Sequence, residues 1–160
     1  MLKTLRLFIF IGTFFATCSA YAFRLTPMVE TFHPKKKSSR TKTFSLLNEG
    51  GRPIALEVEI LKRGQDKTGE ETRSETEDFI VYPPQLKIKG GEKRNLRVSY
   101  VGNKDFSREK AYRLVVRQLP VNLEQNESEG ANNQINFVFE YVSSLNVSPH
   151  GKQPRAKLTV

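Results

Sequence analysis

Residues 53–62 read Pro-Ile-Ala-Leu-Glu-Val-Glu-Ile-Leu-Lys, and this stretch decides the class of fold. Its aliphatic residues alternate with small or acidic ones: Ile54, Leu56, Val58 and Ile60 against Ala55, Glu57 and Glu59. A period of two is typical of a strand with one buried face, because successive side chains point to opposite sides of a sheet. No long stretch of the chain repeats apolar residues at the helical spacing. The sequence therefore favours an all-β domain.

Outward from that strand, short apolar or alternating runs are separated by Gly, Pro, Asn and charged residues. Seven strands are predicted, at 23–31, 41–48, 53–62, 78–82, 93–100, 111–118 and 135–147. Pro27 indicates an edge or a break in the first strand, since proline has no N–H to donate. The polar residues 63–76 and 121–134 are interpreted as loops. Seven short strands with frequent turns predict a seven-stranded immunoglobulin-like β-sandwich, without the tryptophan and disulfide of antibody domains.

The first 22 residues have the pattern of a cleavable export signal. Lys3 and Arg6 precede the short apolar core of residues 7–16, and Ala20-Tyr21-Ala22 supplies the small residues that signal peptidase requires. The apolar run is short for a membrane span, although an uncleaved anchor is the alternative interpretation. Cleavage would remove Cys18, the one cysteine, and leave 138 residues, which suit a single domain held by its core alone. No stable membrane insertion is expected after cleavage.

The charge is that of a soluble, moderately basic protein or, alternatively, of a protein that attracts an acidic partner such as nucleic acid, anionic lipid or a negatively charged protein, and the other residues offer no catalytic set. The chain carries +9, and removing the two basic residues of the signal leaves +7. Nucleic acid is disfavoured by export and because the basic residues are scattered along the chain. His33 and His150 stand far apart in turn-like segments, and no nucleophile–base pair or metal-ligand spacing is present in the sequence. We expect neither an enzyme nor a cofactor.

Three stretches carry a resemblance to a known family. They are residues 78–100 (DFIVYPPQLKIKGGEKRNLRVSY), residues 108–120 (REKAYRLVVRQLP) and the strand that ends in residues 145–154 (LNVSPHGKQP). In this order they resemble the N-terminal domain of PapD-like periplasmic fimbrial chaperones. The opening residues 23–28 (FRLTPM) and residues 111–116 (AYRLVV) are most similar to the archaic lineage. The resemblance implies a domain over 23–148, followed at 149–160 by a linker and the start of a missing or truncated second domain.

The resemblance also implies a function. Chaperones of this family work in the periplasm, lend the last strand of the first domain to an incomplete pilus subunit, and deliver the subunit for assembly, usually at an outer-membrane usher. Main-chain pairing and alternating apolar side chains hold such an added strand. The matching donor residues here are Ile135, Phe137, Phe139 and Tyr141. The alternatives are that this row packs in the domain's own core, or that its inner part serves the core and its outer part the partner.

The family also anchors the subunit's C-terminal carboxylate on two basic residues, and here the sequence departs from the pattern. Val29 or Glu30 lies near the expected arginine of the first strand, and the expected lysine has no evident counterpart. Our leading anchor candidate is Arg113, because a guanidinium can hold a carboxylate through two hydrogen bonds, and the neighbouring Tyr112 is a candidate beside it. Arg117 on the same face is the second candidate, and Arg24 the third.

Two other functions fit the sequence. A stand-alone exported immunoglobulin-like domain could bind an envelope protein or a polysaccharide. A pilus subunit is the third possibility, although subunits usually carry an N-terminal donor extension and often a disulfide, and neither is clear in this chain.

Overall fold

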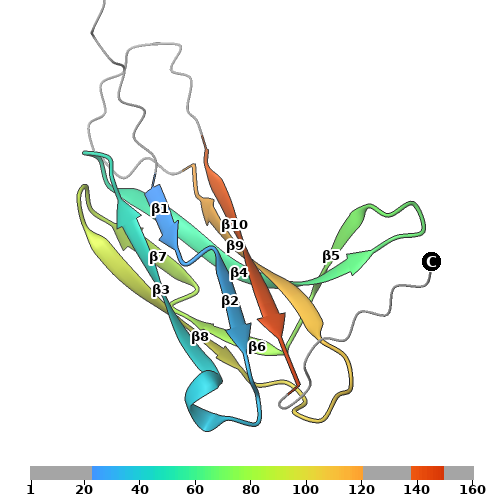
Figure 1. Ribbon diagram of the computed structural model, residues 1–160. Coiled ribbons are helices and arrows are strands. Elements are labelled where there is room, and N and C mark those ends of the chain that lie inside the picture. The colour runs from blue at the N-terminus through green and yellow to red at the C-terminus, as the bar shows by residue number, and fades with distance from the viewer. Residues whose placement is uncertain (1–22, 121–137, 150–160) are drawn as a thin grey trace, which may run out of the picture.

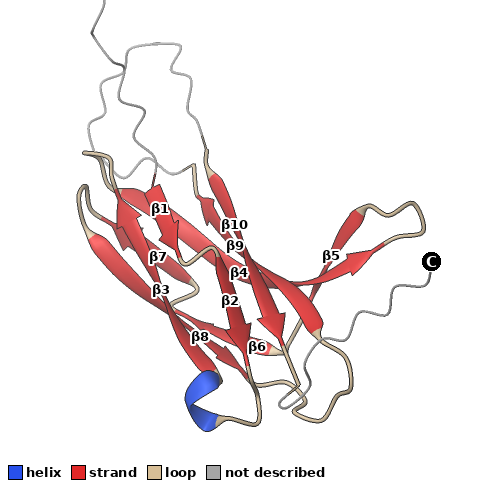
Figure 2. Cartoon of the chain, in the orientation of Figure 1, coloured by secondary structure: helices blue, strands red, loops and turns tan. Residues whose placement is uncertain are grey.

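The computed structural model describes residues 23–120 and 138–149, and these form a sandwich of two β-sheets (Figure 1). The described residues contain ten strands: β1 (Phe23–Thr26), β2 (Val29–Phe32), β3 (Thr41–Asn48), β4 (Ile54–Gln65), β5 (Glu71–Glu75), β6 (Phe79–Tyr82), β7 (Gln85–Ile88), β8 (Lys93–Tyr100), β9 (Lys110–Gln118) and β10 (Glu140–Val147). The first sheet has the order β1-β3-β8-β6, and the second has the order β2-β10-β9-β4-β5 with β7 also paired to β4. One 3₁₀ turn at Lys37–Ser39 is the helical element in Figure 2. The immunoglobulin-like sandwich is confirmed, while the count of seven strands is corrected to ten.

The predicted first strand divides at Pro27. β1 pairs antiparallel with β3 in the first sheet, whereas β2 pairs parallel with β10 in the second. The Thr26–Pro27 peptide bond between them is cis. The break that Pro27 indicated is therefore where the chain passes from one sheet to the other.

The segment interpreted as a polar loop, residues 63–76, is largely a hairpin. β4 continues to Gln65 and pairs antiparallel with β5, with Leu61 opposite Glu75 and Gln65 opposite Glu71. Every residue of β5 is exposed, so there was no buried face to give the segment an alternating apolar pattern. The loop prediction was wrong because hydrogen bonding across a polar hairpin leaves no hydrophobic signature in the sequence.

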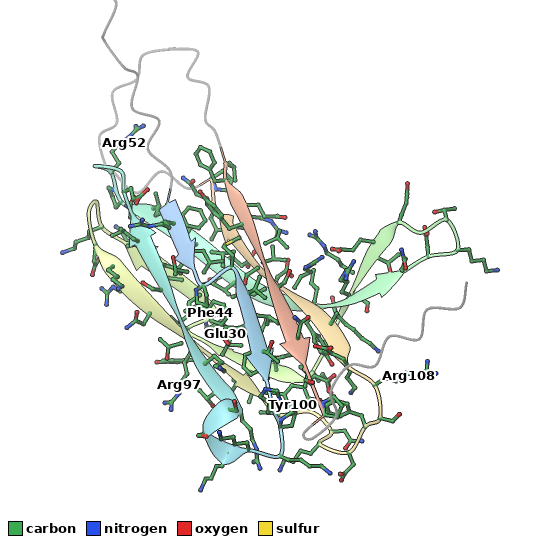
Figure 3. The ribbon with its side chains drawn as sticks, in the orientation of Figure 1. Glu30, Phe44, Arg52, Arg97, Tyr100 and Arg108 are labelled. Atoms are coloured by element: carbon green, nitrogen blue, oxygen red, sulfur yellow. The ribbon has the colours of Figure 1, made fainter. Side chains whose placement is uncertain are left out.

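The core lies between the two sheets and follows the alternation of the sequence. Phe44 and Leu46 of β3 and Leu96 of β8 are fully buried against Leu56 of β4 and Leu114 of β9. Figure 3 shows Phe44 inside the sandwich and Arg97 on its outer side. Fully burying one such side chain contributes about 1.5–3 kcal/mol. Among the described residues, no helix is long and apolar enough to span a membrane.

Candidate functional site

β10 lies between β9 and β2, but β2 covers only part of it. β9 pairs with β10 along its whole length, from Glu140 to Val147. β2 pairs with β10 only from Ser144 onward. Between Glu140 and Ser143, no strand of the described part of the chain lies on the second side of β10. Within the described residues, this segment is therefore a free sheet edge.

Backbone hydrogen bonds show which residues face that edge. The N–H of Gln118, at the end of β9, donates to the carbonyl of Phe139 at 2.9 Å, so residues of odd number on the strand that continues into β10 face β9. The N–H of Ser144 instead donates to the carbonyl of Met28 at 2.9 Å, on the side of β2. By the same alternation, the main-chain groups of Glu140 and Val142 point to the free edge.

The side chains of β10 change from buried to exposed toward its beginning. Leu145 and Val147 are fully buried. Tyr141 packs against the core, with its ring edge-to-face on Phe23 at a centroid distance of 4.7 Å. Phe139, on the same row, is 36% exposed. In the described residues, this row of side chains therefore packs into the core at its inner end and is exposed at its outer end. Ile135 and Phe137 lie outside the described residues.

Arg113 reaches from β9 across the outer face of the second sheet to β10. Ser144 of β10 lies directly opposite Arg113, and Nη1 of Arg113 donates a hydrogen bond to the Ser144 hydroxyl. Val29 of β2, which is 61% exposed, lies opposite Ser144 on the other side. The arginine is therefore placed where the free edge of β10 ends and its pairing with β2 begins.

The guanidinium of Arg113 already holds a carboxylate. Nε donates to Oε1 of Glu71 at 3.0 Å, and Nη2 donates to Oε2. The hydrogen bond with Glu71 raises the pKa of Arg113. Glu71 also accepts hydrogen bonds from Nε of Arg63 at 2.7 Å and from Nε of Arg73 at 3.0 Å. These contacts, that of Arg113 above all, lower the pKa of the Glu71 carboxyl from 4.5 to about 2, so it is ionised near neutral pH.

Tyr112 does not share a face with Arg113. It is fully buried, and its hydroxyl donates a hydrogen bond to Oδ2 of Asp78. Burial, together with Asp78, raises the pKa of this hydroxyl. The structure therefore places Tyr112 in the core, on the opposite side of the strand from any carboxylate bound by Arg113.

The two remaining anchor candidates have their own acidic neighbours. Arg117 donates to Glu140 at 3.0 Å and to Glu59 at 3.2 Å on the outer face of the second sheet. Arg24 lies on β1, in the other sheet, and forms an ion pair with Glu49 at 3.1 Å. Neither lies beside Ser144, so the structure brings only Arg113 of the four candidates to the end of the free edge.

Sequence reasoning missed Glu71 and Ser144. Glu71 stood in a segment interpreted as a loop, and the alternation Glu71, Arg73, Glu75 was the one signal that the segment was a strand. Ser144 has no distinguishing signal, because its role depends on the register between β9 and β10. Across residues 23–120 and 138–149, no three His, Cys, Asp or Glu side chains are grouped so that they could hold a metal ion.

The family model described as pili and flagellar-assembly chaperone, PapD N-terminal domain, matches residues 32–153. The chain belongs to this family. Its members are chaperones, which are not a class of enzyme. A search of curated proteins gave no match.

Solved structures of chaperones resemble this PapD-type domain. A chain in the CsuC–CsuE chaperone–tip adhesion subunit pre-assembly complex, from archaic chaperone-usher Csu pili of Acinetobacter baumannii, is 25% identical with a TM-score of 0.64, and the match covers 81% of this chain and 58% of that one. The E. coli chaperone DraB is 18% identical with a TM-score of 0.60, over 84% of this chain and 58% of that one. A chain in the Salmonella enterica complex of the SafA pilin with the SafB chaperone is 18% identical with a TM-score of 0.61, over 86% and 59%.

This PapD-type domain spans less than two thirds of the length of each of these chains. The match to a complex of archaic pili agrees with the lineage that the sequence indicated. Where the family's first-strand arginine is expected, the exposed Val29 stands beside Ser144, and Glu30 instead forms an ion pair with Lys42 at 3.0 Å. Arg113 therefore brings a guanidinium, from a different strand, to the Ser144 that lies opposite Val29.

Proposed function

We propose that this protein is a periplasmic chaperone for pilus subunits that lends β10 to a subunit whose own sheet lacks a strand. The observation that carries the proposal is the free edge of β10 from Glu140 to Ser143. Its main-chain groups can pair with an added strand, as sheet edges do when they bind extended segments. Membership of the chaperone family supports the same role.

The apolar row of β10 supplies the side chains for this exchange. Phe139 is exposed at the outer end, and Phe137 and Ile135 continue its spacing in the sequence. Each would contribute about 1.5–3 kcal/mol if a groove of the partner buried it fully, before the cost of ordering is subtracted. Tyr141 is assigned to the domain's own core, because its ring is packed on Phe23.

Arg113 is the proposed anchor for the subunit's C-terminal carboxylate. An added strand that runs in the direction of β2 must stop at Ser144, where β2 itself takes over the pairing. Its terminal carboxylate would then lie beside the guanidinium that Ser144 orients. An arginine fork can hold that group through two parallel hydrogen bonds.

The remaining features of the proposal come from the leader and the family. Residues 1–22 would direct export and be removed, so the chaperone would work in the periplasm, where chaperones of this class act. An outer-membrane usher is the proposed receiver of the loaded subunit. The function needs no cofactor and no catalytic step.

The donor strand is tested by replacing Phe137 and Phe139 with Ser in the full chain and co-expressing it with a cognate pilus subunit. We expect the double variant to lose co-purification with the subunit, because the groove-filling side chains are gone. The matched control is Val138→Ser on the opposite face of the same strand, which should retain the subunit. A folded double variant that still co-purifies normally would contradict the donor assignment.

A further inference from the structure

The β4–β5 hairpin stands off the sandwich beyond residue 62. The pairing of β4 with β9 ends at Lys62 opposite Tyr112, and from Arg63 onward β4 pairs with β5 alone. Figure 1 shows this hairpin extending away from the two sheets. In the described part of the chain, no third strand therefore pairs with the hairpin beyond Lys62.

The hairpin keeps its shape by itself. At its tip, Oδ1 of Asp66 accepts hydrogen bonds from the N–H and the hydroxyl of Thr68 and from the N–H of Glu70, at 2.6–2.9 Å. Farther down, the two strands approach so closely at Gly64 that a Cβ there would lie 2.6 Å from the Thr72 hydroxyl oxygen. If Glu71 loses its contact with Arg113, the hairpin should therefore keep this local structure.

Among the described residues, Glu71 makes the short ionic contact between the hairpin and the sandwich, through Arg113, while Arg73 and Glu140 are 3.9 Å apart. The arrangement of Glu71 on Arg113 is the two-bond fork that a C-terminal carboxylate would form with the same guanidinium. The site proposed for the subunit's carboxylate is thus occupied by a carboxylate of the chain itself.

If Glu71 is released from Arg113, its carboxylate still has two arginine partners on the hairpin. Arg63 and Arg73 lie directly opposite each other on the hairpin, where two like charges repel unless an anion lies between them. Both donate to Glu71, so the hairpin itself retains a binding site for this carboxylate. The three arginines also outnumber Glu71, which favours the approach of a second carboxylate.

We propose that Glu71 is an intramolecular stand-in for the subunit's C-terminal carboxylate, and that the hairpin is released when the subunit's carboxylate replaces Glu71 on Arg113. Arg113 is then kept ordered and paired while no subunit is bound. Chain ends without a carboxylate, such as a C-terminal amide, cannot displace Glu71, so the contact adds selectivity for a free carboxylate at the position of Arg113. This inference rests on the anchor role of Arg113 in the proposed function.

The experiment compares wild type, Glu71→Gln and Arg113→Ala, each as the full exported chain, for binding to the co-purifying pilus subunit. The subunit is used with its natural C-terminal carboxylate and with a C-terminal amide. We expect Glu71→Gln to bind the carboxylate form about tenfold more tightly than wild type, equivalent to about 1.4 kcal/mol. Its binding to the amide form should be unchanged. Glu75→Gln, on the same hairpin strand, is the matched control and should behave as wild type.

A second measurement follows the hairpin directly. Spin labels on Lys67→Cys at the hairpin tip and Arg97→Cys on β8 report the distance between hairpin and sandwich, and Cys18, the one native cysteine, belongs to the predicted leader. We expect the distance distribution to broaden with the carboxylate form of the subunit and to stay unchanged with the amide form. If Glu71→Gln binds the carboxylate form no more tightly than wild type, or if the hairpin does not move, the role proposed for Glu71 is overturned. The anchor role of Arg113 would remain.

The failure of the anchor itself has a different signature. In that case wild type would bind the carboxylate and amide forms equally, and Arg113→Ala would bind as wild type does. That result would overturn both the anchor role of Arg113 and the role of Glu71 that depends on it. The donor strand would still be judged by the Phe137 and Phe139 variants.

Discussion

At the scale of single residues, Asn48 shows how one buried amide can join the two sheets. Its Nδ2 donates to the carbonyls of Arg52 at 2.8 Å, Lys89 at 3.1 Å and Ile88 at 3.2 Å, and its Oδ1 accepts from the N–H of Gly50 at 3.0 Å. Asn48 ends β3 in the first sheet, whereas Ile88 ends β7 in the second. Asn48 is 2% exposed, so water cannot replace these bonds.

Asn48→Ala should therefore lower the free energy of unfolding by about 1–3 kcal/mol, because the buried Ile88 carbonyl and two partly buried carbonyls lose their donor. Urea denaturation, followed by circular dichroism, measures this loss. Asn95→Ala, on the outer face of β8, is the control and should change stability by no more than about 0.5 kcal/mol. Equal midpoints for the two variants would show that the amide does not hold the sheets together.

At the scale of elements, the two edges of β10 differ in their hydrogen bonding. The edge toward β9 is hydrogen bonded along the strand, and the edge beyond β2 is free from Glu140 to Ser143. Successive residues direct their N–H groups to opposite edges. A proline can therefore remove a donor from one edge without touching the other.

Val142→Pro removes an N–H that points to the free edge, so we expect a folded domain that binds the pilus subunit at least tenfold more weakly. Co-purification and circular dichroism of the same preparation measure both properties. Val142→Ala keeps the N–H and should bind as wild type does. Ser143→Pro removes an N–H that faces β9 and should unfold the domain. Full binding by a folded Val142→Pro protein would rule out strand addition at this edge.

At the scale of the whole molecule, the first described strand, β1, begins at the residue that follows the predicted leader. Phe23 is 1% exposed, pairs with Asn48 across β1 and β3, and packs on Tyr141 of the other sheet. The small residues Ala20 and Ala22 stand immediately before it in the sequence. Cleavage after Ala22 would make Phe23, the first residue of β1, the new N-terminus.

We therefore expect the exported protein to begin at Phe23, which intact mass and N-terminal sequencing of periplasmic material will show. Ala22→Leu should block processing and leave the precursor associated with the membrane, because signal peptidase requires a small residue there. Tyr21→Phe, at the position between the two alanines, should be processed normally. An exported wild-type chain that retains residues 1–22 would support the uncleaved anchor instead.

Much of the fold could be predicted from the sequence because burial imposes a period on it. Ile54, Leu56, Val58 and Ile60 alternate along β4, and Leu56, Val58 and Ile60 are buried as the pattern requires. The polar hairpin of β5 escaped prediction because no face of it is buried. The position of Pro27 correctly indicated a break, since proline cannot continue the ladder.

The sequence by itself determined the all-β class, the inward and outward rows of each strand, the family resemblance and Arg113 as a candidate. Only the tertiary structure decided that β2 stops covering β10 at Ser144, that Tyr112 is a core residue, and that Glu71 lies on Arg113 from 42 residues away in the chain. The physical reason is that alternation depends on neighbours in sequence, whereas strand pairing and ion pairs depend on register between segments that only folding brings together.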